Sequence, residues 1–288
     1  MNTFPRIRMI GLDLDGTLLN SQKEVTPPVR RALDRAVGAG VVVLPATGRS
    51  VTGIPQVVRD ATHCRYAVVC NGAEVHDLAE GRVLHSDYFT TGGFLAVLEN
   101  CRQLGLAVSV MANGFMYTDW PDFSKLDGEF TPAQMEYFRT SRHYVPDLAV
   151  FIPQSGYPVA KFSLQFPDLS TRPRAQQVLA ARLDTAVTAS LDTNLEVNTA
   201  TASKGNALLW LAAHLGIPRA AVMAAGDGSN DLDMILKAGL GVAMANSQPE
   251  VLAQADYIAP SCDEDGIAAV INGILDNTIN IPNTEETI

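Results

Sequence analysis

Two aspartates, Asp13 and Asp15, follow an apolar stretch in the segment GLDLDGTLLN at residues 11–20. Two carboxylates one residue apart repel each other and lose hydration when they are buried, unless a positive charge lies between them. The segment is therefore either a solvated strand end followed by a turn, or a site where carboxylates hold a cation for chemistry.

Three further segments carry polar residues that are able to take part in such chemistry. They are LPATGRS with Thr47, TASKGN with Lys204, and AAGDGSND with Asp227, Asn230 and Asp231. Each segment alone is an ordinary turn, helix start or surface lysine. A helix N-terminus disfavours a cation, so a lysine there favours a nearby anion. All four segments together favour a functional site, because residues that break local rules tend to mark one.

Short apolar runs alternate with helical patterns in residues 1–83 and again in residues 196–288. This alternation predicts an α/β fold with a Rossmann-like, doubly wound parallel sheet that helices cover on both faces. Thr26 and Pro27 predict the start of the first helix, as N-cap and first helical residue. The predicted strands are 8–14, 41–46, 66–70, 220–225, 241–244 and 256–260.

The predicted sheet brings the polar segments together. Asp13, Thr47 and Asp227 each follow a predicted strand, and ligands of open parallel sheets bind beyond the carboxyl ends of the strands. Carboxylate and backbone oxygens can hold Mg²⁺, with water and a phosphate as further ligands. The sequence therefore favours a cation and phosphate site, in which a metal offsets the repulsion between Asp13 and Asp15.

Residues 84–195 follow a different pattern, which predicts an α+β domain inserted between the two halves of the sheet domain. Asn113-Gly114 lies between two apolar runs and predicts a hairpin. Residues 160–166 alternate large apolar side chains with smaller or polar ones, which predicts a strand with one buried face. A second hairpin is predicted with Asp192 in its turn.

Composition and charge exclude several classes of protein. The net charge of −10 and the lack of a basic run argue against a nucleic-acid partner. No apolar stretch approaches the roughly 18 to 20 residues that span a membrane, and the first residues lack the apolar core of a signal peptide. The four cysteines show no metal or disulfide spacing, which favours reduced thiols. We expect a cytoplasmic protein that is a monomer or a homodimer.

The motifs DLDGTLL, ATGR, SKG and GDGSND, in this order, resemble the four motifs of the haloacid dehalogenase-like (HAD) hydrolase superfamily. NGAEV at 71–75 and GVAMANSQPEV resemble its Cof-type branch, whose cap is of type IIB. The resemblance implies a catalytic core of residues 1–83 and 196–288, with residues 84–195 as a cap domain that selects the substrate.

The resemblance implies a Mg²⁺-dependent phosphatase for small phosphorylated metabolites, such as sugar phosphates or nucleotide-like cofactor phosphates. Asp13 would be the nucleophile that forms an aspartyl-phosphate. Asp15 would protonate the leaving alcohol and then deprotonate the hydrolytic water. The metal ligands would be Asp13, the backbone carbonyl of Asp15, and Asp227.

The same resemblance assigns phosphate binding to a second set of residues. Thr47, the Gly48 amide, Lys204 and Asn230 would donate hydrogen bonds to the phosphoryl oxygens. Asp231 would lie behind them and orient Lys204 or a metal-bound water.

Two alternatives remain for the function, and one for a neighbouring arginine. A phosphosugar mutase of the same superfamily shares the first motif, and phosphate release without an isomer would exclude it. A non-enzymatic sensor of a phosphometabolite needs neither a nucleophile nor a general base, so the intact motif set argues against it.

Arg49 either has a structural role or contacts the leaving group, and Asn71-Gly72 predicts a turn.

Overall fold

The computed structural model describes residues 7–119, 130–166, 168–189 and 193–279. The chain divides into two compact units, Met1–Ser86 with Ser203–Ile288, and Asp87–Ala202. The division falls at 86 and 202, a few residues beyond the predicted boundaries at 83 and 195. No helix of the described residues is long and apolar enough to cross a membrane.

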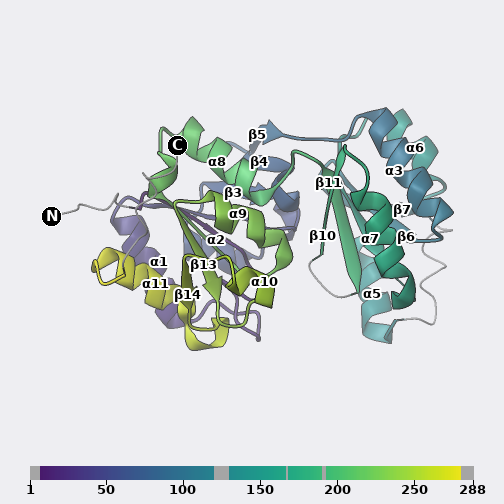
Figure 1. Ribbon diagram of the computed structural model, residues 1–288. Coiled ribbons are helices and arrows are strands. Elements are labelled where there is room, and N and C mark those ends of the chain that lie inside the picture. The colour runs from purple at the N-terminus through teal and green to yellow at the C-terminus, as the bar shows by residue number, and fades with distance from the viewer. Residues whose placement is uncertain (1–6, 120–129, 167, 190–192, 280–288) are drawn as a thin grey trace. The chain divides into compact units, whose positions relative to one another are not determined.

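The first unit is built on a parallel sheet of five strands in the order β14-β13-β12-β1-β2, of which Figure 1 labels β13 and β14. β1 (Met9–Leu12) lies next to the edge strand β2 (Val42–Pro45) and pairs on its other side with the middle strand β12 (Val222–Gly226). β13 (Leu240–Met244) and β14 (Tyr257–Ala259) complete it. The predicted α/β class is thereby confirmed.

Helices cover both faces of this sheet. α1 packs against α11, while α8 packs against α9 and places Leu208 directly over Gly11 of β1. Thr26 caps α1, and its Oγ1 accepts a hydrogen bond from the Val29 amide at 3.4 Å, as the sequence predicted. The helices are α1 (Pro27–Gly38), α2 (Gln56–Thr62), α8 (Lys204–His214), α9 (Leu232–Lys237), α10 (Pro249–Leu252) and α11 (Gly266–Leu275). The 3₁₀ turns are η1 (Val51–Gly53), η2 (Cys70–Gly72), η4 (Arg219–Ala221), η5 (Ser229–Asp231) and η6 (Cys262–Glu264).

The third predicted parallel strand belongs to a different sheet. β3 (Tyr66–Val69) pairs antiparallel with β4 (Glu74–Asp77), which pairs with β5 (Arg82–Ser86). Among the described residues, β3 joins the main sheet through one parallel bridge, between Ala46 and Val68. The predicted strand at 66–70 is thus confirmed and is parallel to the end of β2 where the two meet, but its ladder partner is the antiparallel β4 and not a strand of the parallel sheet.

The second unit contains a sheet of six strands in the order β10-β11-β9-β6-β7-β8. All neighbouring pairs are antiparallel except β7 with β8. The Asn113-Gly114 hairpin is confirmed, since both residues have positive φ (49° and 80°) as a tight primed turn requires. Asp192 in the second predicted turn lies outside the described residues. The strands are β6 (Ala107–Ala112), β7 (Phe115–Asp119), β8 (His143–Val145), β9 (Val159–Gln165), β10 (Thr185–Thr188) and β11 (Asn194–Thr199). The helices are α3 (Thr91–Gln103), α5 (Pro132–Ser141), α6 (Leu148–Ser155), η3 (Leu169–Thr171) and α7 (Arg172–Ala180).

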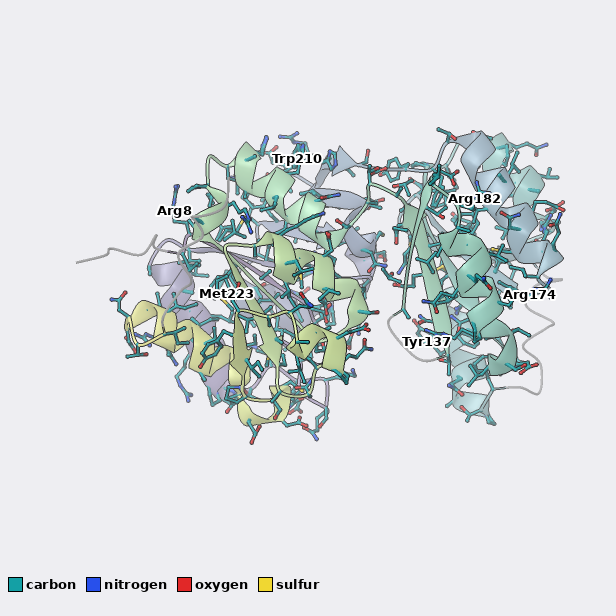
Figure 2. All side chains as sticks on the ribbon, in the orientation of Figure 1. Arg8, Tyr137, Arg174, Arg182, Trp210 and Met223 are labelled. Atoms are coloured by element: carbon teal, nitrogen blue, oxygen red, sulfur yellow. The ribbon has the colours of Figure 1, made fainter. Side chains whose placement is uncertain are left out.

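The central strand β9 differs from its prediction. Phe162 and Leu164 lie in the hydrophobic core, but every residue of the strand is buried. On the other face Lys161 Nζ forms an ion pair with Glu196 at 2.5 Å, so its charge is compensated without exposure. Side chains elsewhere follow the usual division: Met223 lies inside the first unit, whereas Tyr137 lies on the surface of α5 (Figure 2).

Candidate active site

The parallel sheet places the carboxyl ends of β12, β1 and β2 side by side. The amide of Asp13 donates to the Ala225 carbonyl at 2.9 Å, and the amide of Ala46 donates to the Leu12 carbonyl at 2.7 Å. The carboxyl ends of these three strands therefore place Asp13, Thr47 and Asp227 on the same side of the sheet, as the sequence predicted.

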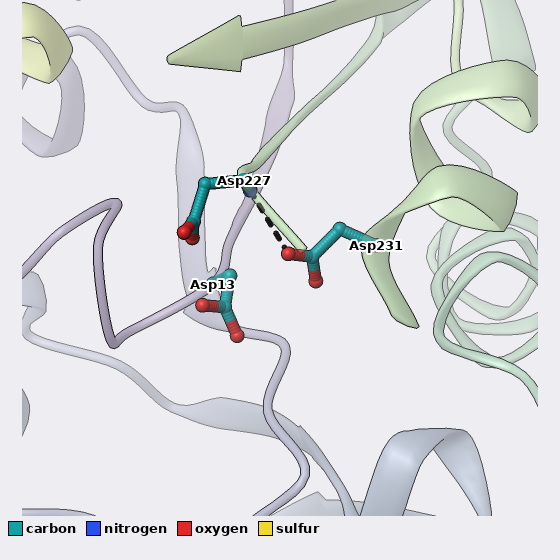
Figure 3. A group of neighbouring side chains, drawn as sticks. All are labelled: Asp13, Asp227 and Asp231. Atoms are coloured by element: carbon teal, nitrogen blue, oxygen red, sulfur yellow. Dashed lines mark hydrogen bonds between the residues drawn. The ribbon is translucent and has the colours of Figure 1, made fainter. Parts of the chain in front are cut away.

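Three carboxylates gather at these strand ends. One oxygen each of Asp13, Asp227 and Asp231 lies within 4.8 Å of the others (Figure 3). Asp231 comes from the turn after Asp227, and its Oδ2 accepts hydrogen bonds from the amides of Asp227 (3.0 Å) and Gly228 (2.9 Å). These bonds fix the turn that follows β12.

Lys204 supplies a buried positive charge to the cluster. It is the first residue of α8, and its side chain has no exposed surface. Its Nζ donates to Asp13 Oδ1 at 2.6 Å and to Asp231 Oδ1 at 2.5 Å. Burial by itself lowers the pKa of Lys204, but the charges of Asp13 and Asp231 outweigh it and raise the pKa above its ordinary value. Lys204 is therefore a permanent cation at this position.

One lysine does not neutralise three carboxylates, and burial together with the uncompensated negative charge raises the pKa values of Asp13 and Asp227. Burial and the charge of Asp231 raise the pKa of Asp13 to about 7, against the opposing effect of Lys204. Burial and Asp231 also raise the pKa of Asp227 to about 6. Carboxylates held together against their repulsion indicate a site that an additional cation would stabilise.

The donor set fits a divalent metal ion of the Mg²⁺ type, which prefers oxygen ligands. Asp227 is held by the Thr17 hydroxyl, which donates to its Oδ1 at 2.9 Å. Gly16, with φ +85°, lies so close that a Cβ would be 2.4 Å from Asp227 Oδ2. The glycine is thus required for the carboxylate to reach the cluster.

The turn after β2 is braced by a second loop. The Asn71 amide donates to the Thr47 carbonyl at 3.1 Å, and the Cys70 amide donates to the Arg49 carbonyl at 2.9 Å. Asn230 Nδ2 lies 3.5 Å from Asn71 Oδ1. The loop at 70–71 therefore contacts two of the segments that the sequence assigned to phosphate binding, the one with Thr47 and the one with Asn230.

This loop has unusual backbone geometry. Cys70 and Asn71 have φ values of 53° and 57°, and Gly72 has φ 92°. Consecutive left-handed residues are rare outside glycine. Gly72 also lies against the start of α8, where a Cβ would be 2.0 Å from the Ser203 carbonyl oxygen. The predicted turn at Asn71-Gly72 thus supports the residue that precedes Lys204.

Asp15 has different partners from Asp13. Arg49 donates to both of its carboxylate oxygens, with Nη2 at 2.8 Å from Oδ2, and Lys23 Nζ lies 2.9 Å from Oδ1. Burial alone raises the pKa of Asp15, but the hydrogen bond from Lys23 and the charge of Arg49 outweigh it and lower the pKa. Asp15 is therefore held as a carboxylate.

Comparisons with known proteins identify the family. Residues 10–271 match the family model of the haloacid dehalogenase-like hydrolases. This chain belongs to that family. The 5-amino-6-(5-phospho-D-ribitylamino)uracil phosphatase YcsE of Bacillus subtilis is 29% identical and covers 92% of this chain and 94% of its own. The pyridoxal phosphate phosphatase YbhA of Escherichia coli is also 29% identical, over 92% of this chain and 97% of its own.

A solved structure shows the same fold. The HAD subclass IIB sugar phosphatase BT4131 superimposes with a TM-score of 0.77 at 20% identity, over 93% of this chain and 99% of its own. The resemblance of the motifs to the HAD superfamily and its branch with a type IIB cap is thereby confirmed.

The first unit of this HAD-family chain contains every residue to which the motifs assigned a role. These residues are Asp13, Asp15, Thr47, Gly48, Lys204, Asp227, Asn230 and Asp231. Their individual roles stay predictions. The sequence did not predict the contacts of Thr17 and Lys23, because each depends on how the loop after β1 folds. The position of Thr17 within the DLDGT motif could have indicated a role for it, whereas no motif in the sequence includes Lys23.

Proposed function

We propose that this protein is a Mg²⁺-dependent phosphatase that hydrolyses small phosphorylated metabolites through an aspartyl-phosphate on Asp13. The observation that carries the proposal is the cluster of Asp13, Asp227 and Asp231 around the buried Lys204. A pure binding site for phosphate would not place three carboxylates where the anion has to sit. A site for nucleophilic attack on phosphorus needs one of them, a metal justifies Asp227, and Asp231 fixes the ammonium group of Lys204.

Mg²⁺ would be held by Asp13, Asp227 and the backbone carbonyl of Asp15, and it would supply positive charge that lowers repulsion between nucleophile and phosphate. In the first step a carboxylate oxygen of Asp13 forms a bond to phosphorus while the bond to the leaving oxygen breaks. For this step Asp15 has to leave Lys23 and Arg49 and carry a proton, which it gives to that oxygen. In the second step Asp15 takes a proton from water, whose oxygen attacks phosphorus and releases Asp13.

The other motif residues would hold the phosphoryl group during transfer. Thr47, the Gly48 amide and Asn230 would donate hydrogen bonds to its oxygens. Lys204 would donate from the buried side, where Asp231 fixes its ammonium group. Because these donors are fixed before the substrate arrives, they would stabilise the developing charge without reorganising.

The names of the two relatives favour small substrates. One acts on a ribitylaminouracil phosphate and the other on pyridoxal phosphate. In our proposal the second unit, Asp87–Ala202, serves as the cap that selects among such molecules. The direct test is phosphate release from a panel of small phosphate esters, with Mg²⁺ and with a chelator. Release that persists without any divalent metal, or no release from any ester, would count against the proposal.

The apparent affinity for Mg²⁺ should depend on pH. Asp13 and Asp227 have pKa values raised to about 7 and about 6, so both bind protons that a metal has to displace. Below these values the affinity should fall by up to about tenfold per pH unit for each displaced proton. Thermal shift titrations with Mg²⁺ at about pH 5.5 and about pH 8 should give the weaker midpoint in acid. Equal midpoints would contradict the assignment of these carboxylates as ligands.

Replacement of Gly72 by alanine should lower turnover by about tenfold or more, because small misplacements of catalytic groups are costly. The new Cβ would be 2.0 Å from the Ser203 carbonyl oxygen and 2.8 Å from the Lys204 amide, so the start of α8 has to move. Gly81→Ala is the matched control. Gly81 also has positive φ (64°), but an added Cβ there would have no atom within 4 Å. Phosphate release and thermal unfolding of both variants should be compared. Equal losses of turnover would show that backbone strain, and not the clash, is responsible.

A further inference from the structure

Two cationic side chains converge on the carboxylate of Asp15. Lys23 Nζ and Arg49 Nη2 each lie 2.9 Å from its Oδ1, and Arg49 Nη2 and Nε lie 2.8 Å and 3.1 Å from its Oδ2. Both oxygens are thus engaged. The side chains of Lys23, Arg49 and Asp15 are 61%, 37% and 41% exposed, so a ligand from solvent can reach all three.

The position of Lys23 is fixed by its loop. Asn20 Oδ1 accepts hydrogen bonds from the amides of Gln22 (3.1 Å) and Glu24 (2.8 Å), and the Asn20 carbonyl accepts one from the Lys23 amide at 2.9 Å. Within this loop Lys23 adopts φ 63°, a left-handed conformation that is uncommon for a residue with a side chain. The loop therefore holds the lysine backbone at a set place beside the site.

Arg49 reaches the same carboxylate from a different segment. It follows the turn after β2, and its Nη1 also donates to the Gly53 carbonyl at 3.3 Å. Its backbone carbonyl accepts the hydrogen bond from Cys70. The guanidinium is thus anchored beside Asp15 and presents a planar pair of donors, which match a carboxylate or a phosphate.

This arrangement conflicts with the proposed role of Asp15. A general acid has to form a hydrogen bond with the leaving oxygen, but both oxygens of Asp15 already accept bonds from Lys23 and Arg49. If Asp15 turned toward the substrate, the two cations would lose the anion that they share. Two adjacent like charges without a counter-ion repel each other, so a second anion in place of Asp15 would be favoured.

We propose that Lys23 and Arg49 form a subsite for a second anionic group of the substrate, a carboxylate or a further phosphate on the leaving group. This group would displace Asp15 and free it for proton transfer. The preferred substrates would then be small phosphate esters with an anionic leaving group. The inference rests on the proposed phosphatase function and names the substrate class for that site.

Matched pairs of esters test the inference. Terminal phosphoglycerate and glycerol phosphate differ in a carboxylate against a hydroxymethyl group, and fructose bisphosphate and fructose monophosphate differ in a second phosphate. Each would be measured as a competitor of p-nitrophenyl phosphate hydrolysis with Mg²⁺. We expect the anionic member of at least one pair to inhibit about tenfold more strongly or better, since charge-assisted bonds to an arginine are strong. The pair that shows the preference identifies the anion.

Substitutions assign the preference to the two cations. In Lys23→Gln and in Arg49→Gln the ratio of inhibition constants should fall to about threefold or less. Arg35→Gln is the matched control, because it removes a positive charge from an exposed ion pair with Asp276 at the C-terminus of α11. This variant should keep the wild-type ratio of inhibition constants. A wild-type ratio near one for both pairs, or a ratio unchanged by both substitutions at the subsite, would overturn the inference.

The competition assay separates this inference from the proposed function. Turnover of p-nitrophenyl phosphate reports on the phosphatase activity alone, and its absence would count against that activity. In that case the same pairs would be compared by the rise in unfolding temperature that each ligand produces. A larger rise with the anionic member, lost in Lys23→Gln, would still support the subsite, and equal rises would reject it.

Discussion

Asp13→Asn should lose turnover by about 10⁴-fold, the scale on which removal of a catalytic nucleophile acts. An amide has the shape of the carboxylate but cannot attack phosphorus. Its carbonyl oxygen can still accept the hydrogen bond that Lys204 donates to Asp13 Oδ1. The fold should therefore be retained, and the unfolding temperature of the metal-free variant should match or exceed that of the wild type, because a repelled negative charge is gone. Phosphate release and thermal unfolding measure the two effects.

The control for this variant is Asp34→Asn, which makes the same replacement in an exposed residue that pairs with His63. It should leave turnover within about twofold, as is usual for surface substitutions. If Asp13→Asn kept activity within about tenfold of Asp34→Asn, Asp13 would not be the nucleophile.

The parallel sheet and its site were predictable because the deciding signals are local. Buried parallel strands read as short apolar runs, and Thr26 and Pro27 mark the first helix start by their side-chain chemistry. Once the strands are placed, parallel topology brings their carboxyl ends together, so the proximity of Asp13 and Asp227 follows without further information. The same reasoning fails for β3, whose antiparallel pairing with β4 depends on where the following turns lie.

The contacts of Asp15 were not predictable from the sequence. Lys23 reaches it only because the loop after β1 folds around Asn20 and Lys23 itself adopts a left-handed backbone conformation. Arg49 reaches it from the end of another strand. The burial of Lys161 shows the same limit, since its partner Glu196 is far away in the sequence. Charged groups settle where a partner from elsewhere in the chain compensates them, and local patterns do not specify that partner.

Lys204→Met should affect both activity and stability. The lysine side chain is fully buried between Asp13 and Asp231, and removal of one partner from a buried charge pair costs about 3 to 5 kcal/mol of unfolding free energy. Turnover should fall by about 10³-fold, because the phosphoryl group loses its buried cation. Methionine keeps most of the volume, so the loss reflects charge more than packing.

The stability loss should grow with pH. Lys204 lowers the pKa of Asp13, so without Lys204 the folded Asp13 carboxyl holds its proton to a higher pH than in the wild type, further above the pKa of the unfolded chain. A raised folded pKa gives stability that is present below the unfolded pKa and disappears as pH rises through the folded value. The deficit against wild type, measured by urea unfolding of the metal-free proteins, should therefore be larger at about pH 8 than at about pH 5.5.

A second substitution distinguishes the charge effect from a packing defect. Asp231→Asn in the Lys204→Met background removes one of the uncompensated carboxylates and should recover part of the stability lost at about pH 8, with little recovery at about pH 5.5. Turnover should remain low, because the cation that faces the phosphate is still missing. A deficit that is independent of pH and unchanged by Asp231→Asn would mean that Lys204 acts by filling space in the core, and the electrostatic account of this site would fail.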